Sequence, residues 1–134
     1  MTEKTLAIIK PEAVAHGNTG PIIFMIEKNG FTISDMKKVH LTKKEAEAFY
    51  AVHKERPFYG ELVEGMTTGP VVVMALEKEG AILAWRELMG ATDPQKATHG
   101  TVRRMFGTSI GSNATHGSDA PQTAHEEVAF FFPS

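Results

Sequence analysis

The stretch Pro70-Val71-Val72-Val73-Met74-Ala75-Leu76-Glu77 decides the fold class, because it is the clearest buried strand in the chain. Its six consecutive apolar residues include three β-branched valines. A second segment, Thr5 to Lys10, is equally short and apolar, and Pro11 ends it. We therefore predict a sheet in which residues 5–10 form a central strand.

Helical patterns lie between the strands. Residues 21–28 fit a helix with a proline in its first turn and the pair Asn29-Gly30 at its end. Thr42, with Glu45 three residues later, forms a capping box that starts a helix running to about His53. The remaining elements are predicted from periodicity and from bounding glycines and prolines: helices over 59–66 and 81–89, and strands over 31–39 and 126–132.

The order of these elements lacks the regular alternation of a doubly wound sheet. A long, glycine-rich and largely irregular segment, 90–119, precedes the last strand, and loops of this length are often functional. We predict a single α+β domain over 1–134, a ferredoxin-like βαββαβ sandwich whose four-stranded antiparallel sheet carries helices on one face. The helix over 21–28 is hydrophobic nearly all round, so a second subunit could cover one of its sides.

Charge and residue types exclude several function classes. The chain has 14 Lys and Arg against 16 Asp and Glu, so any polyanion site must be a local cluster of cations. Cysteine is absent, which excludes disulfides and cysteine-ligated zinc. The six histidines show no helical metal-pair spacing, and no glycine-rich phosphate-binding motif occurs. No apolar run reaches the ~20 residues of a membrane span, so we expect a cytoplasmic protein.

His116 is the most informative single residue. It lies in Asn113-Ala114-Thr115-His116-Gly117-Ser118-Asp119, among small and hydrogen-bonding side chains that leave room around the ring. A structural histidine usually packs against bulky neighbours, whereas an imidazole in an open turn can act as a nucleophile, a base or a ligand. We interpret His116 as functional.

Several cations and one aromatic residue allow either a functional or an ordinary structural role. Lys10 ends the first strand, where it is either an edge residue with its amine in solvent or a ligand for an anion. Arg86 in the helix over 81–89 and the pair Arg103-Arg104 are equally compatible with a solvated surface. Phe58 would ordinarily pack in the core. The residues by themselves leave these alternatives open.

Four segments of the chain resemble the nucleoside diphosphate kinases, in the short form found in bacteria. They occur in that family's order and spacing over about residues 5–132: Ile8 to Val14, Phe49 to Phe58, Leu88 to Pro94 and Asn113 to Asp119. The resemblance implies an enzyme that transfers the terminal phosphate of a nucleoside triphosphate, typically ATP, to a nucleoside diphosphate. Transfer through a phosphohistidine implies ping-pong kinetics. The implied role is the supply of nucleoside and deoxynucleoside triphosphates.

The resemblance also implies roles for individual residues. His116 would carry the phosphoryl group, Glu127 would hold its other ring nitrogen, and Ser118 would donate to Glu127. Tyr50 would place a hydroxyl beside the histidine. The implied nucleotide contacts are Lys10, Arg86, Arg103 and Thr92 toward the phosphates, Asn113 and Lys10 on the ribose hydroxyls, and Phe58 against the base.

The cofactor that the resemblance implies is Mg²⁺, bridging the β- and γ-phosphates. No direct protein ligand is predicted for it, and Asp119 is the candidate for a contact through water. The implied partners are nucleoside tri- and diphosphates and further copies of this chain, in a tetramer or a hexamer. The sequence ends at Ser134 without the longer tail that some relatives use between subunits, so both sizes stay open. Neither a membrane nor a specific nucleic acid is expected as a partner.

Three residues depart from the family's usual pattern. Glu12 replaces a common aspartate and, as a poorer helix N-cap, is expected to alter the local start of structure. Met25 replaces a commonly basic residue, which makes the helix over 21–28 still more apolar. Met105 replaces a common acidic residue, so Arg104 is expected to be freer.

Two other functions compete with this interpretation. A catalytically weak, nucleotide-binding relative acting mainly as an interaction protein would lack the histidine or part of the phosphate clamp, yet every matched position is present. A nucleic-acid-binding module on a ferredoxin-like sheet would need an aromatic RNA-binding motif and a basic face, and the sequence has neither.

Overall fold

The computed structural model describes residues 2–133 and contains a four-stranded sheet in the order β2-β3-β1-β4. The strands are β1 (Glu3–Ile9), β2 (Thr32–Val39), β3 (Val71–Lys78) and β4 (Thr115–Gly117). All neighbouring strands are antiparallel, and β1 pairs with β3 along its whole length. The predicted α+β class with a four-stranded antiparallel sheet is confirmed.

Both faces of this sheet are covered, as the central strand β1 shows. Ala7 and Ile9 belong to one core cluster and Leu6 and Ile8 to another, and all four are fully buried. Because side chains alternate along a strand, two buried sets require helices on both faces. The prediction that helices lie on one face is therefore wrong.

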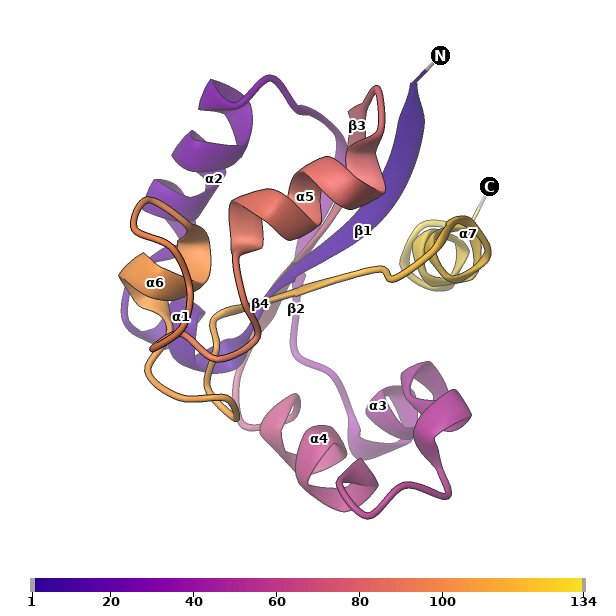
Figure 1. Ribbon diagram of the computed structural model, residues 1–134. Helices are drawn as coiled ribbons and strands as arrows, with labels where there is room; N and C mark the ends of the chain where they lie inside the picture. The colour runs from indigo at the N-terminus through magenta and orange to yellow at the C-terminus, as the bar shows by residue number, and fades with distance from the viewer. Residues whose placement is uncertain (1, 134) are drawn as a thin grey trace.

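Two groups of helices supply these covers (Figure 1). The first face is covered mainly by α2 (Thr19–Lys28) and α5 (Ala81–Met89), together with the short helices α1 (Pro11–Ala15) and α6 (Val102–Phe106). The second face is covered by α3 (Lys43–Phe49), α4 (Tyr59–Gly65) and α7 (Pro121–Phe131). Trp85 of α5 is fully buried under the first cover.

The C-terminal part of the chain differs from the prediction. Residues 126–132, predicted as a strand, belong to the end of the helix α7, which begins at Pro121 and buries Ala124 and Phe131. The run of phenylalanines gave a strand-like composition, but packing of one helix face on the sheet decides the outcome. The fourth strand is instead β4, inside the segment 90–119 that we expected to be irregular. The helix α6 also lies in that segment.

The other predicted elements are present with adjusted ends. The capping box of Thr42 and Glu45 is confirmed, since each side chain bonds the other residue's backbone N–H. The helix it starts ends at Phe49 rather than at His53, and the short 3-10 helix η1 (Ala51–His53) follows. In α2 the buried residues include Ile26, whereas Phe24 is 64% exposed. Among residues 2–133, no helix has both the length and the apolar character needed to cross a membrane.

Candidate active site

His116 lies on the edge strand β4, opposite Ile8 of β1. Its backbone carbonyl accepts a hydrogen bond from Trp85 Nε1 at 3.2 Å. The next residue, Gly117, makes this close approach possible, because a Cβ atom there would lie 2.6 Å from Trp85 Cδ1. The backbone of His116 is thus held against the buried Trp85, while the His116 side chain remains 20% exposed.

A carboxylate fixes one nitrogen of the His116 ring. Nε2 lies 2.9 Å from Glu127 Oε1, and the same oxygen accepts a hydrogen bond from Ser118 Oγ at 2.8 Å. Ser118 Oγ in turn lies 3.3 Å from the backbone N–H of Leu6, which donates to it. An ionised carboxylate only accepts, so this contact selects the neutral tautomer with the proton on Nε2 and the lone pair on Nδ1. No hydrogen bond within residues 2–133 engages Nδ1.

Aromatic side chains surround the other edges of the ring. The Phe49 and Tyr50 ring centroids lie 5.6 and 6.4 Å from that of His116, both in edge-on arrangements. The Tyr50 hydroxyl is buried and has no hydrogen-bond partner among residues 2–133. Its burial, and secondarily the charge of Glu127, raises the pKa of Tyr50 well above its usual range. The tyrosine therefore stays neutral beside the histidine.

Lys10 continues the site beyond the end of β1. Its Nζ donates to Asn113 Oδ1 at 2.8 Å, and Asn113 Nδ2 donates to the carbonyl of Thr92 at 3.1 Å. The pKa of Lys10 is lowered to about 8, first by burial and then by the nearby charge of Arg103, while the charge of Glu12 opposes the shift. An anion that comes close to a partly desolvated amine of this kind stabilises its protonated form.

Arg103 ties the two ends of the long segment together. Nη1 donates to the carbonyl of Gly90 at 3.1 Å and Nη2 to the carbonyl of Thr115 at 3.0 Å. Its Nε is buried and has no hydrogen-bond partner in the described part of the chain, residues 2–133. Burial and the neighbouring charge of Arg86 both lower the pKa of Arg103, and a guanidinium nevertheless remains charged at neutral pH. The charge of Arg103 therefore lies near that of a second guanidinium group, Arg86.

A cavity of about 390 Å³ opens beside these guanidinium groups. Its lining includes four residues singled out from the sequence: Arg86, Thr92, Arg103 and Asp119. Lys10, Asn113 and His116 are not part of that lining, but they lie next to it. Hydrogen bonds link Lys10 through Asn113 to Thr92, and His116 directly precedes Gly117 on β4; both Thr92 and Gly117 line the cavity. The predicted phosphate contacts thus gather around one edge of the sheet.

Phe58 lies apart from this cavity, at the start of α4. Its side chain is 46% exposed, and its ring centroid lies 5.5 Å from that of His53. The sequence left a core position open as the ordinary alternative, and the exposure excludes it. A half-exposed phenyl ring on the α3–α4 side is free to present one face to a ligand.

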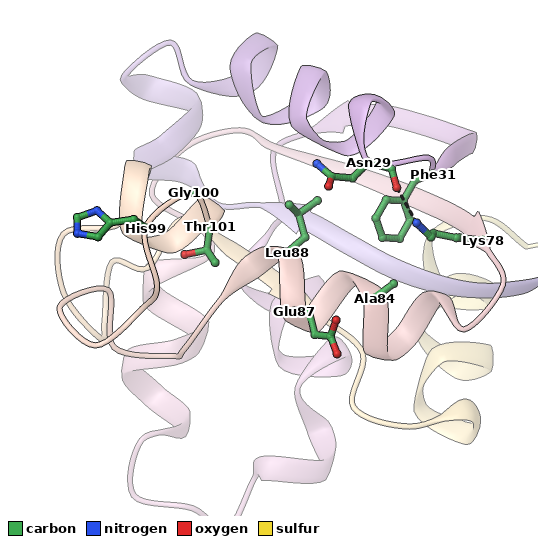
Figure 2. A pocket seen from close by; sticks show the side chains of 9 residues that line it. All are labelled: Asn29, Phe31, Lys78, Ala84, Glu87, Leu88, His99, Gly100 and Thr101. Atoms are coloured by element: carbon green, nitrogen blue, oxygen red, sulfur yellow. Dashed lines mark hydrogen bonds between the residues drawn. The ribbon is translucent and has the colours of Figure 1, made fainter.

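A second cavity, about 320 Å³ in volume, also borders α5 and is lined by Ala84 and Leu88 of that helix together with Phe31 (Figure 2). Its lysine, Lys78, donates to the carbonyl of Asn29 at 2.6 Å and lies 5.2 Å from the Phe31 ring centroid. Glu87 lines both cavities, so the difference lies in the cations: this cavity has one lysine, already engaged by Asn29, whereas the other has the guanidinium groups of Arg86 and Arg103. This cavity is therefore the poorer place for phosphates.

Two of the sequence departures behave differently from our expectations. Glu12 is not a helix N-cap: that position of α1 is Lys10, and the Glu12 carboxylate instead faces the backbone of Ala114. Arg104 is not freer, because its Nη1 donates to the carbonyl of Gln95 at 3.1 Å. The third departure, Met25, behaves as an apolar residue of α2: it is partly buried and packs against the first core cluster.

Sequence reasoning missed Trp85 and Glu12 as residues that contact the histidine segment. Trp85 is the only tryptophan in the chain and sits in the apolar pattern of α5, which indicated a core role but not its bond to His116. The contact between Glu12 and Ala114 leaves no local pattern. Within residues 2–133, no group of three or more histidine and carboxylate side chains is arranged to hold a metal ion.

A histidine with one nitrogen fixed by a carboxylate, next to a cavity lined by guanidinium groups, is equipped for phosphoryl transfer. Fold and site together define the class as a phosphotransferase on a four-stranded α+β scaffold. Comparisons with known proteins identify the family. The pattern of the nucleoside diphosphate kinase family matches residues 3–134. The chain belongs to this family, and its enzyme activity is that of a nucleoside diphosphate kinase.

Individual members of this family are similar to this chain over nearly its whole length. The nucleoside diphosphate kinase of Geotalea uraniireducens is 58% identical over 97% of this chain and 95% of its own length. That of Agrobacterium fabrum is 56% identical over 97% of this chain and 93% of its own. The crystal structure of the Aquifex aeolicus enzyme has a TM-score of 0.97 at 43% identity, covering 100% of this chain and 97% of its own. The Halobacterium salinarum enzyme, solved in complex with CDP, has a TM-score of 0.94 at 36% identity, covering 100% and 90%.

Proposed function

We propose that this kinase works through a phosphohistidine at Nδ1 of His116. The supporting observation is the orientation of the ring: Glu127 Oε1 accepts a hydrogen bond from Nε2–H at 2.9 Å, which leaves the Nδ1 lone pair for attack. In the first half-reaction an N–P bond forms and the bond from the γ-phosphorus to its bridging oxygen breaks, so a nucleoside diphosphate leaves. In the second, a terminal oxygen of another nucleoside diphosphate attacks the phosphorus and frees the imidazole.

The positive side chains stabilise charge on the phosphoryl group in flight. Arg86 and Arg103 line the cavity next to β4, and Thr92 lines the same cavity. Transfer of a phosphoryl group needs positioning and positive charge around the oxygens rather than covalent help. Lys10 would contact the phosphates and the ribose, and Asn113 the ribose, since their side chains already lie within hydrogen-bond distance of each other.

Phe58 would hold the base by stacking, which tolerates any base because each has a π face. The half-exposed ring supports this role. The CDP bound to the Halobacterium salinarum relative supports nucleotides as substrates here. Such a site would accept purine and pyrimidine nucleotides alike, with the ribose contacts of Asn113 independent of the base.

Magnesium would arrive bound to the phosphates of the nucleotide substrate. Asp119 lines the cavity and is exposed, so its carboxylate could bind a water of the hydrated ion. The charge of the ion would supplement that of the two arginines.

We further propose that residues 1–134 act as one catalytic domain, that copies of the chain assemble into a tetramer or hexamer, and that they act in the cytoplasm. Support for assembly comes from two exposed apolar side chains, Phe24 on α2 and Met36 on the edge strand β2, at 64% and 52%. Exposed apolar groups on an edge strand and a helix are typical of interfaces.

Labelling tests the phosphohistidine directly. The protein is mixed with γ-labelled ATP and no acceptor, and the chain is expected to keep a label that is stable in base and lost in acid. His116→Ala should abolish both labelling and transfer while binding nucleotide nearly as well. Transfer that persists in this variant would require another phosphoacceptor, and an unlabelled wild-type chain would point to a non-catalytic, nucleotide-binding relative.

A further inference from the structure

Glu12 and Ala114 are in contact although 102 residues separate them in the sequence. Glu12 Oε1 accepts a hydrogen bond from the backbone N–H of Ala114 at 3.3 Å. On the other side of the same residue, the Ala114 carbonyl accepts from the backbone N–H of Lys10 at 2.8 Å. Both peptide groups of Ala114 are therefore held by the segment from Lys10 to Glu12.

Ala114 has a backbone conformation that needs such support. Its φ is +74°, and it is the only residue other than glycine with a positive φ among residues 2–133. A side chain with a Cβ rarely adopts this left-handed region unless its surroundings impose it. Ala114 is fully buried, so water cannot replace the bond from Glu12.

The direction of β4 depends on this turn. Ala114 directly precedes Thr115, where the strand starts and whose carbonyl accepts from Arg103. His116 follows one residue later, in register with Ile8. If Ala114 relaxed to an ordinary negative φ, the path of the chain into β4 would rotate. The His116 ring and the Arg103 anchor would both shift.

The length of the Glu12 side chain matters for this contact. At 3.3 Å the bond to Ala114 is already near the outer limit of hydrogen-bond distance. An aspartate has one C–C bond fewer, about 1.5 Å, and would not reach from the same backbone position. The substitution noted in the sequence, glutamate in place of the family's common aspartate, thus creates a contact of its own.

We propose that Glu12 is a positioning residue for the phosphorylated histidine: it holds Ala114 in the left-handed conformation and thereby aims His116 at the phosphate site. This inference rests on the proposed role of His116 as the phosphoacceptor. Glu12 does not line the cavity beside the arginines, so it acts through the backbone and not on the substrate. Instead it lines a hollow on the far side of α1, with Pro11 and Val14.

The charge of Glu12 has a second, separable effect on Lys10. The ionisable groups that face Lys10 are Glu12 from α1 and Arg103 from α6, and its other neighbour is the neutral amide of Asn113. Glu12 raises the pKa of Lys10, while Arg103 lowers it. A glutamine at position 12 would keep an oxygen for the Ala114 N–H but remove this charge.

The experiment measures the rate at which γ-labelled ATP phosphorylates His116 in a single turnover. Glu12→Ala should slow this step about tenfold, because a displaced nucleophile loses its near-attack geometry. Ala114→Gly should stay within about twofold of the wild type, since glycine adopts positive φ without support. The double variant should recover most of the tenfold loss, which a merely structural role of Glu12 would not predict.

Two further variants separate reach from charge. Phosphorylation of Glu12→Asp should be as slow as that of Glu12→Ala. Glu12→Gln should be phosphorylated at the wild-type rate at neutral pH. As the pH is raised, however, its activity should begin to fall at a lower pH than that of the wild type, because the pKa of Lys10 is no longer raised by Glu12. Glu27→Ala, which removes an exposed glutamate from α2, is the matched control and should change nothing.

Distinct results overturn the inference or its premise. The inference is overturned if Glu12→Ala lowers thermal stability but leaves the single-turnover rate within twofold of wild type. A double variant as slow as Glu12→Ala would also overturn it, because the loss would then not pass through Ala114. A wild-type chain that acquires no label on His116 would instead overturn the proposed function.

Discussion

Glu127 Oε1 binds two donors of the β4 region at once, His116 Nε2 at 2.9 Å and Ser118 Oγ at 2.8 Å. The carboxylate is only 16% exposed and comes from α7, so one helix on the second face of the sheet sets the tautomer of a ring on its edge strand. Removing the charge of Glu127 should make His116 a weaker nucleophile without weakening nucleotide binding.

Glu127→Gln is expected to lower kcat about 10²-fold while changing KM for the nucleotide little, because general-base-type assistance by one group contributes about this much. The glutamine can still accept from one donor, but it cannot stabilise positive charge that develops on the ring during attack. Glu126→Gln, at an exposed position of the same helix, is the control and should retain full activity. A variant at position 127 with raised KM and normal kcat would contradict this assignment.

Lys10 should link nucleotide binding to proton uptake. Burial lowers its pKa to about 8, with Arg103 adding to the shift and Glu12 opposing it. As pH rises through this value the free enzyme loses the positive charge, whereas bound phosphates favour the protonated amine. Calorimetry at pH 8 in buffers of different ionisation enthalpy should therefore show uptake of about half a proton per nucleotide, and KM should rise above this pH.

The same shift has a defined sign for stability. Lysine in the unfolded chain titrates near its ordinary value of 10.5, so between pH 8 and 10.5 the unfolded state holds more protons at this position than the folded state. The contribution of Lys10 to the free energy of unfolding therefore rises with pH in that window. Lys10→Gln should abolish both the proton uptake and this rise; uptake that survives the substitution would assign the linkage to another group.

Arg103 and Arg104 form a matched pair for testing the phosphate clamp. Arg103 binds the carbonyls of Gly90 and Thr115 and lines the cavity, whereas Arg104 binds only Gln95 from an exposed position. Arg103→Ala should lower kcat about 10²–10³-fold with a smaller rise in KM, because its charge matters most in the transition state. Arg104→Ala should stay within a few-fold of wild type in steady-state assays.

Arg103→Lys separates the two roles of the guanidinium. Lysine keeps the charge but cannot reach two carbonyls from one planar group. We expect partial loss of kcat and a lower unfolding midpoint in urea, since the ends of the 90–115 segment would no longer be tied. If the lysine variant were as active as the wild type, only the positive charge of Arg103, and not its planar guanidinium group, would matter for catalysis.

Local sequence patterns predicted the parts of the site that lie next to one another in the chain. The segment Asn113 to Asp119 was informative because its small residues are an immediate property of the sequence. By contrast, β4 is three residues long and exists only because it pairs with β1, at the other end of the chain. No periodicity can show over so few residues.

The prediction of a strand at residues 126–132 was wrong because a local pattern was present but misleading. Phe130, Phe131 and Phe132 gave a strand-like signal, yet only Phe131 is buried, so the pattern there is that of a helix with one side on the sheet. The bond from Glu12 to Ala114 was equally hidden, because it depends on the left-handed turn at Ala114 and not on either residue type. Pairing and long-range contacts, rather than composition, decide these features.

Gly117 should be irreplaceable for steric reasons rather than conformational ones. A Cβ atom at this position would lie 2.6 Å from both Met89 Cε and Trp85 Cδ1, and Trp85 is fully buried. Gly117→Ala should therefore lower the free energy of unfolding by about 1–3 kcal/mol, the usual cost of forcing extra volume into a packed core. Gly111→Ala is the matched control, since its Cβ would meet no atom within 4 Å.

Urea unfolding, followed by the emission of Trp85 as the only tryptophan, measures the effect of Gly117→Ala at the contact itself. We also expect slower phosphorylation of His116, because displacing Trp85 removes the donor to the His116 carbonyl. A Gly117→Ala variant as stable as Gly111→Ala would mean that Met89 and Trp85 yield without cost, and the rigid mounting of His116 on the core would then be refuted.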